Sequence, residues 1–337
     1  MTDFALLKEL TQAWGVAGRE KAVRAIILRE LEGLADGVRV DSLGNVIALK
    51  RGRGGPEGKK IMLSAHMDEI GLQVKKIESD GRLKVRSVGW VWAAALYNDQ
   101  VVFQNGVVGV VGCDGRVEDA KNDAGKLYID IGCTSKEDAL KYVHVGDYAG
   151  FAGPWYELQN GRISAKSFDD RVGCFMLLEA LRRNEGGGVN DVYYVFSVQE
   201  EIGCRGAVTA AHQIRPDIGI SVDVAPDHAY PCDLVGCNAV GEGVAVALGD
   251  PSVVLDEYLV DEMLDCCEEH QIHYQRSVMD RGGTDASSIN LSGDGVRVAG
   301  IAVVDRYPHS KCSVIAKEDV TAGITLLDKY TRRVFRF

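Results

Sequence analysis

Acidic and histidine side chains follow apolar segments at five points in the chain. Four of these points lie in AHMDEIG, SFDDRVG, SVQEEIG and SVDVAPD, and the fifth lies in RYPHSKCS, just after the apolar run VAGIAVV. Together they contain these candidate residues: His66, Asp68, Asp169, Asp170, Glu200, Glu201, Asp223 and His309. Imidazole and carboxylate groups in this combination suit a paired site for divalent ions such as zinc, cobalt or manganese.

In two of these segments, the spacing allows neighbouring residues to have different chemical roles. Glu200 and Glu201 are adjacent, so their side chains diverge to opposite sides of an extended segment. One of them can therefore bind a cation while the other acts on a reacting water as a general base. Asp68 lies two residues after His66, where its carboxylate can accept a hydrogen bond from the imidazole and fix the ligating tautomer.

Each segment also has a simpler explanation when it is taken alone. A single histidine after a strand is more often a core or loop residue than a ligand, and the Glu200–Glu201 pair fits a solvated acidic turn. Asp169 and Asp170 fit the first turn of a helix, where the helix dipole favours acids. The metal hypothesis therefore depends on the order of the segments and their shared position after apolar strands.

The elements that position these residues predict a helix-flanked sheet. Residues 4–14 and 20–34 have apolar side chains at helical spacing and predict two N-terminal helices. The run KIMLSAH predicts a buried strand that ends at His66. From Asp169 onwards helices and strands alternate up to a closing helix that starts at Glu318, which indicates a largely parallel sheet. Ligands bind at the C-terminal edge of the strands in such sheets.

The middle of the chain has a different pattern. Residues 72–162 contain short strands separated by tight turns such as Asn105-Gly106 and Asn160-Gly161. We therefore expect a β-barrel-like insertion over 72–162, within a catalytic α/β domain formed by 1–71 and 163–337. The expected fold class is α/β, with a helix-flanked mixed sheet interrupted by a smaller all-β domain.

Composition excludes several other classes of protein. The 337 residues are 46% hydrophobic and 26% charged, close to the averages of globular proteins. The formal net charge of −11 repels nucleic acid and anionic lipid. No apolar run approaches the roughly 18 residues that span a bilayer, and the N-terminus lacks a signal-peptide pattern. We expect a cytoplasmic protein with neither nucleic-acid nor membrane partners.

The order of the motifs resembles that of the M42 metalloaminopeptidases, the family of glutamyl and tetrahedral aminopeptidases. The resemblance is carried by AHMDEIG, FDDRVG, QEEIG, SVDV, GGTDASS and RYPHS, in that order along the chain. It covers nearly the whole chain, including the β insertion, whose segments YIDIGCTSKEDA and HVGDYAGF are similar to the second domain of that family. Each motif is short, but the combination is specific.

The resemblance implies two divalent metal ions per subunit, with zinc or cobalt as the expected metals. It implies that Asp169 bridges the ions and that four residues are terminal ligands: His66, Glu201, Asp223 and His309. Glu200 is then the general base, and we count Glu200 and Asp68 as the catalytic residues. The Asp169–Asp170 peptide bond is expected to be cis. A homo-oligomer is expected too, with a dodecamer as one form.

We therefore expect an aminopeptidase that removes the N-terminal residue from short peptides, with a hydroxide bridging the two ions as nucleophile. The alternative is a metal-dependent deacylase or amidohydrolase of small N-acyl substrates, which can use the same residues. A non-catalytic binding module is disfavoured by the complete set of candidates. Many family members have proline and then an acidic residue after the last histidine, whereas SKCSVIAKED follows His309 here. Substrate preference is consequently the property that the resemblance predicts least.

Overall fold

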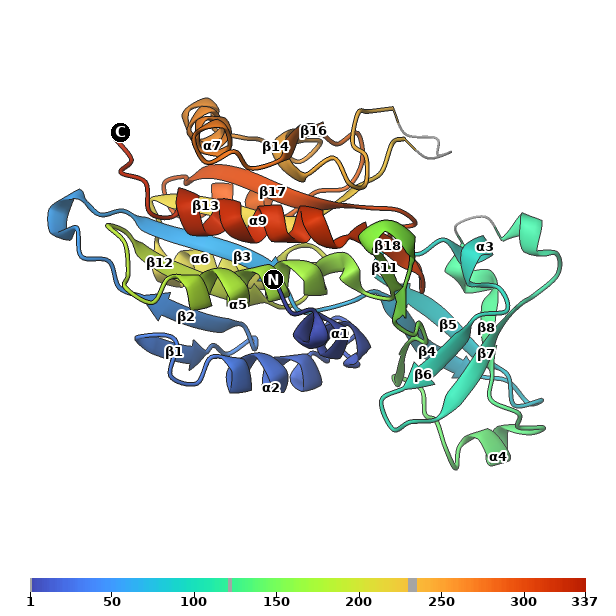
Figure 1. The fold of residues 1–337 in the computed structure, drawn as a ribbon. Coiled ribbons are helices and arrows are strands. Elements are labelled where there is room, and N and C mark those ends of the chain that lie inside the picture. Colours follow the sequence, from blue (N-terminus) through green and yellow to red (C-terminus); the bar gives the residue numbers. More distant parts are fainter. Residues whose placement is uncertain (1, 121–122, 230–234) are drawn as a thin grey trace.

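The computed structural model describes residues 2–120, 123–229 and 235–337. A large sheet covered by helices forms one part of the molecule, and a small closed β-barrel lies at one end of it (Figure 1). The predicted fold class, α/β with a helix-flanked mixed sheet interrupted by a smaller all-β domain, is confirmed. Within these residues, no helix is both long enough and apolar enough to cross a membrane.

The large sheet has nine strands in the described part of the chain, in the order β1-β2-β12-β3-β13-β17-β14-β15, with β16 paired to β14. The strands are β1 (Gly37–Val40), β2 (Val46–Lys50), β3 (Lys60–His66), β12 (Asp191–Ser197), β13 (Ile218–Pro226), β14 (Val244–Asp250), β15 (Val253–Val254), β16 (Tyr274–Val278) and β17 (Arg297–Asp305). Four central strands, β12, β3, β13 and β17, are mutually parallel. Their carboxyl ends therefore meet at one edge of the sheet.

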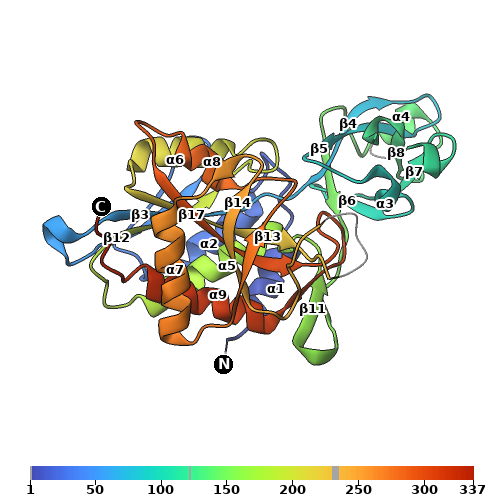
Figure 2. The same ribbon diagram turned by 90° about the horizontal axis from the view of Figure 1, so that it is seen from above.

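Helices cover both faces of this sheet. They are α1 (Ala5–Gln12), α2 (Lys21–Glu30), α5 (Phe168–Arg183), α6 (Arg205–Ile214), α7 (Glu257–His270), α8 (Asp285–Asn290) and α9 (Lys317–Tyr330). Figure 2 shows α5, α7 and α9 on one side of the sheet and α6 and α8 on the other. Every residue of α5 from Asp170 to Leu178 is buried, because this helix lies within the main hydrophobic core. The start of α5 is therefore held in place by packing.

The central strands are apolar because both of their faces are covered, as is usual for parallel strands in α/β proteins. In β3 every residue after Lys60 is buried, and β13 is buried from Ile218 through Ala225. Such runs end in polar residues only where the strand leaves the core. Acids and histidines can therefore lie at the C-terminal edge of the sheet without interrupting its apolar core.

The barrel closes in the order β4-β5-β8-β7-β6-β9. Its strands are β4 (Gly71–Ile77), β5 (Leu83–Val88), β6 (Gln100–Phe103), β7 (Val108–Cys113), β8 (Leu127–Asp130) and β9 (Tyr148–Phe151), with the short helices α3 (Ala93–Leu96) and α4 (Lys136–Ala139) beside them. Gly106 has φ of +88° in the predicted Asn105-Gly106 turn, which joins β6 to β7 as a hairpin. The barrel has an apolar core of its own.

The chain returns from the barrel to the large sheet through a small antiparallel sheet. Its strands are β10 (Tyr156–Glu157), β11 (Arg162–Ala165) and β18 (Ser313–Ala316), in that order. β18 comes from the segment just after His309 and pairs with β11, just before Asp169. This pairing brings two distant parts of the chain together at the site. The division into 1–71 with 163–337 and 72–162 remains a prediction.

A buried ion-pair cluster joins the end of β3, the exit from β11 and the start of α5. The Glu69 carboxylate lies 2.6 Å from Lys166 Nζ and 3.5 Å from Arg171 Nη2, and it accepts a hydrogen bond from the Gly15 amide at 2.9 Å. Burial raises the pKa of Glu69, but the two cations outweigh burial and hold the pKa below its usual range. The cluster ties together the segments that precede and follow Asp169.

Replacing Glu69 by glutamine is expected to lower the free energy of unfolding by about 3–5 kcal/mol, because one partner of a buried ion pair is removed and two buried cations are left without its charge. Chemical denaturation followed by circular dichroism measures this. Glu9→Gln is the matched control, since Glu9 pairs with Arg29 at 2.8 Å on the surface and such pairs contribute less than about 1 kcal/mol. Equal losses in the two variants would contradict a stabilising role for the cluster.

Candidate active site

The predicted site residues lie together at the carboxyl ends of the central strands. His66 ends β3, Glu200 and Glu201 follow β12, and Asp223 lies near the end of β13. Ser197 and His66 are register partners in the parallel pair of β12 and β3. Because the strands are parallel neighbours, their following residues emerge at the same edge. Asp169 at the start of α5 and His309 after β17 complete the group.

Asp169 lies between the two histidines. Its Oδ1 is 2.9 Å from His66 Nε2, and its Oδ2 is 3.0 Å from His309 Nε2. Each carboxylate oxygen therefore faces a different imidazole. A carboxylate that binds two cations, one with each oxygen, needs this arrangement.

Three further carboxylates surround this axis. Glu201 Oε2 is 3.7 Å from His309 Nε2, whereas Glu200 Oε2 is 3.9 Å from His66 Nε2. The two adjacent glutamates thus diverge toward different histidines, as expected from their spacing. Asp223 Oδ1 lies 4.0 Å from the same nitrogen, His66 Nε2.

Both histidines have a fixed tautomer. His309 Nδ1 is 2.8 Å from the carbonyl oxygen of Trp90, and His66 Nδ1 is 3.2 Å from the carbonyl oxygen of Asp68. A carbonyl only accepts, so each Nδ1 carries the proton and donates it. Nε2 of each imidazole then faces the carboxylates, and its lone pair would be available to a cation held between them.

Asp68 holds neighbouring site residues in place through its carboxylate. Its Oδ1 accepts a hydrogen bond from the Glu200 amide at 3.0 Å, and its Oδ2 accepts one from the Glu201 amide at 3.1 Å. The same Oδ1 lies 3.5 Å from His66 Nδ1. This buried carboxylate therefore orients the histidine and both glutamates.

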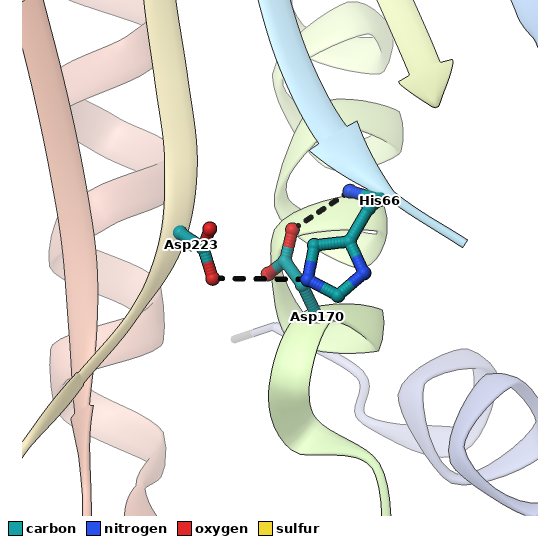
Figure 3. A group of neighbouring side chains, drawn as sticks. All are labelled: His66, Asp170 and Asp223. Carbon is teal, nitrogen blue, oxygen red and sulfur yellow. Dashed lines mark hydrogen bonds and ion pairs between the residues drawn. The ribbon is translucent and has the colours of Figure 1, made fainter. Parts of the chain in front are cut away.

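Asp170 has a larger part in the site than the sequence indicated. Its Oδ2 accepts a hydrogen bond from the His66 amide at 3.0 Å, and its Oδ1 accepts one from the Gly173 amide at 2.9 Å. Figure 3 shows Asp170 and Asp223 beside His66, with Asp223 facing a ring nitrogen and Asp170 facing the backbone amide. The Asp169–Asp170 peptide bond is cis, as expected. Neither aspartate has helical φ and ψ, so α5 becomes regular only after them.

Burial and crowding shift the protonation of the acids. Burial raises the pKa of Glu200 to about 8, with added repulsion from Asp285 and Glu201, and burial raises the pKa of Glu201 to about 8 as well. Burial and neighbouring acids also hold the pKa of Asp170 and of Asp223 well above the usual range. For Asp169, burial acts in the same direction, but His309 and His66 outweigh it and hold its pKa far below that range.

These shifts show that the group holds more negative charge than its own side chains can neutralise. Burial lowers the pKa of His66 and of His309, yet the surrounding carboxylates outweigh burial and raise both. Among the described residues, three sets of ligand atoms lie close enough together to hold an ion. His66 with Asp170 and Asp223 is one, His66 with Asp169 and Glu201 is another, and Glu200 with Cys204 and Asp285 is the third. Divalent cations would supply the missing positive charge, so the donor set fits them.

The backbone is held in an unusual conformation at several points around the site. Ser167, Gln199 and His309 have positive φ values of 56°, 58° and 54°. Non-glycine residues in the left-handed region cost of order 1–3 kcal/mol and persist where the surrounding structure determines them. Each of these residues precedes or contains a site side chain, and the conformation aims that side chain into the group.

Two neighbours of the site were not among the residues predicted to form it. Asp285 lies in the GGTDASS motif, and its buried Oδ2 accepts hydrogen bonds from Ser64 Oγ at 2.6 Å and Ser197 Oγ at 2.7 Å. Cys204 Sγ lies 3.0 Å from Glu200 Oε1, and burial raises the pKa of this thiol, which disfavours the nucleophilic thiolate form. The motif pointed to Asp285, whereas the spacing from Glu200 was the only signal for Cys204.

The comparison with known families decides the kind of protein. The model for the M42 glutamyl aminopeptidases matches residues 44–326. The chain belongs to the M42 family. The M42 family is metal-dependent, and membership makes this protein a peptide hydrolase with the aminopeptidase function of that family.

Relatives of the M42 protein match along almost the whole chain. The lysyl aminopeptidase of Pyrococcus furiosus is 33% identical over 340 residues, covering 97% of this chain and 96% of that protein. The TET aminopeptidase of a Thaumarchaeota archaeon from marine sediment matches with a TM-score of 0.92 and 32% identity, covering 98% of this chain and 96% of the other. The TET1 peptidase of Pyrococcus horikoshii, which can assemble into a tetrahedron or a large octahedral shell, matches with a TM-score of 0.83 and 31% identity over 96% and 97% of the two chains.

Proposed function

We propose that the protein hydrolyses the peptide bond after the N-terminal residue of short peptides, using two divalent metal ions and Glu200 as general base. The observation that carries the proposal is the Asp169 carboxylate, which directs one oxygen to each of two histidines at 2.9 and 3.0 Å. Asp169 would bridge the ions, and four residues would be their terminal ligands: His66, Glu201, Asp223 and His309. Zinc and cobalt both suit imidazole and carboxylate ligands.

Bound divalent ions would lower the pKa of a coordinated water and polarise the carbonyl of the scissile bond. The protein supplies the proton transfer. Burial raises the pKa of Glu200 to about 8, and a general base works best when its pKa lies near the pH of the reaction. Its carboxylate removes a proton from the attacking water and then delivers that proton to the departing amine.

Glu200 is suited to this task by its position beside Glu201. The amides of both residues are held by Asp68, so the two side chains cannot exchange places without breaking those hydrogen bonds. Glu201 is directed toward His309 as a ligand, and Glu200 is left to act as the base. Separate roles for two adjacent carboxylates disfavour a glycosidase, whose two acids face each other across about 5–9.5 Å.

The proposal includes an arrangement for the whole protein. Residues 1–71 and 163–337 would form the catalytic domain, and 72–162 the inserted domain. The subunits would assemble into a homo-oligomer such as a dodecamer, supported by the PhTET1-12s structure, which is a dodecamer, and by the TET1 peptidase of P. horikoshii, which can assemble into a tetrahedron or a large octahedral shell. The cytoplasmic location stays a prediction.

A peptide library tests the function directly. The purified protein is loaded with zinc or cobalt and mixed with peptides of which half have free and half have acetylated N-termini, and mass spectrometry follows the products. Loss of single residues from free N-termini only is the expected result. Release of acetyl groups would favour the deacylase alternative, and no cleavage of any peptide would overturn the proposal.

Asp68→Asn is expected to weaken metal binding by about 10- to 100-fold, the usual effect of removing a partner that orients ligands. The asparagine retains one acceptor oxygen, so one of the Glu200 and Glu201 amides loses its hydrogen bond. Titration with zinc in competition with a chelator measures the affinity. Asp261→Ala on the exposed side of α7 is the control, and equal affinities in the two variants would contradict the supporting role.

A further inference from the structure

An uncharged segment of the barrel lies against the active site. Residues 88–97, VGWVWAAALY, join β5 to β6 and contain no charged side chain. Three of their aromatic side chains are exposed: Trp90 by 50%, Trp92 by 44% and Tyr97 by 41%. Large exposed aromatic groups close together are uncommon on a soluble surface and often mark a binding site.

Gly89 allows this segment to approach the site closely. Gly89 has φ of +79°, and a Cβ atom at this position would lie 2.6 Å from Ile70 Cγ2 and 3.2 Å from Glu201 Oε2. A side chain would therefore push the segment away from Glu201. The next residue, Trp90, can follow the wall of the site only because residue 89 has no side chain.

Trp90 contacts His309 in two ways. Its carbonyl oxygen accepts the hydrogen bond from His309 Nδ1 at 2.8 Å, and its indole centroid is 5.8 Å from the imidazole centroid. The backbone contact fixes the position of the indole relative to the site. The ring itself remains half exposed, so it borders the space that a substrate must enter.

Trp92 extends this surface outward. Its indole packs edge to face on the Trp90 indole, with a centroid distance of 5.5 Å and an interplanar angle of 88°. Two indoles at right angles form an apolar corner, and each supports the position of the other. Trp92 is one ring further from His309, so its side chain can be changed without removing a contact to a site residue.

We propose that the Trp90–Trp92 corner binds a large apolar side chain of the peptide, from a residue next to the scissile bond. This inference rests on the proposed aminopeptidase function and names the substrate class: peptides with an aliphatic or aromatic residue at the first or second position. Residues 88–97 offer no charge to pair with an acidic or basic side chain. An apolar side chain, in contrast, gains from the removal of both surfaces from water.

The test compares short peptides that differ at one position. One series has leucine, phenylalanine, alanine, glutamate or lysine as the first residue before a constant remainder, and the other varies the second residue in the same way. For the wild type we expect kcat/KM to be at least about tenfold higher for leucine or phenylalanine than for alanine in one of the series. The series that shows the preference identifies the position that occupies the corner.

Trp92→Ala is expected to reduce this preference by about 10- to 100-fold, through a loss of kcat/KM for the apolar peptides. Trp92→Phe should restore most of the preference, because a ring again fills the corner. Tyr142→Ala is the matched control, since Tyr142 is also 50% exposed and lies on the barrel near α4. Metal content and circular dichroism of all variants show whether the fold and the ion site are intact.

The outcomes separate the inference from the function on which it rests. If the wild type cleaves peptides with no apolar preference in either series, or if Trp92→Ala keeps the preference with intact fold and metal content, the corner does not select substrates. If the metal-loaded wild type cleaves no peptide at all, the aminopeptidase proposal is overturned and the inference is overturned with it.

Discussion

Glu200→Gln is expected to lower kcat by about two to four orders of magnitude, the usual contribution of a general base. The amide has nearly the same shape as the carboxylate but cannot take a proton from the attacking water. Glu200 Oε2 lies 3.9 Å from His66 Nε2, whereas Asp169 Oδ1 lies 2.9 Å from the same nitrogen. The variant leaves Asp169 and the other predicted ligands unchanged. Steady-state kinetics with a cleaved peptide measures the loss, and elemental analysis should find the wild-type metal content.

The control for this variant is Glu242→Gln, on an exposed glutamate that lies 4.0 Å from His273 Nε2, which is not a site residue. Its kcat should match that of the wild type. Full activity in Glu200→Gln would show that another group moves the proton. A large loss of metal would instead show that Glu200 is a ligand, so the two readouts together distinguish a base from a ligand.

Asp169→Ala is expected to weaken metal binding by more than about 100-fold, which exceeds the effect of removing a residue that only supports ligands. Among the residues that the structure describes, Asp169 is the one carboxylate whose two oxygens lie within 3.0 Å of two different histidines, so its removal affects both predicted ion positions. Inductively coupled plasma mass spectrometry after dialysis should find less than one ion per subunit, and peptide hydrolysis should fall to the background rate.

Asp265→Ala on the exposed side of α7 serves as the control for Asp169→Ala and should keep the full metal content. Circular dichroism of both variants confirms that they are folded. If Asp169→Ala retained two ions per subunit, the bridging role would be wrong, even if activity were lost.

The sequence predicted the central sheet well because its strands are continuous apolar runs. KIMLSAH corresponds to β3, and the apolar run before Asp223 corresponds to β13. Since parallel strands share one carboxyl edge, polar residues that follow such runs were expected to meet, and the structure places His66, Glu200 and Asp223 together. The roles of these residues remain predictions that the variants above test.

The remaining parts of the site depend on tertiary contacts that no local pattern encodes. Asp170 fits a helix cap in the sequence, but its oxygens accept the amides of His66 and Gly173, and the first of these contacts joins segments about a hundred residues apart. Trp90 belongs to the barrel, and its contact with His309 exists only because the barrel packs against the sheet edge. The Glu69 cluster was missed for the same reason.

The order of strands in the large sheet has a consequence for biosynthesis. β3 is made early, but it lies between β12 and β13, and β17 is the last of the four central strands to be made. Such pairing between distant segments is slow to form, because the chain loses entropy on closing long loops before the stabilising contacts are made. A nascent chain that has not yet reached His309 lacks one end of the Asp169 bridge. The group of candidate site residues is therefore complete only when the segment after β17 has been made.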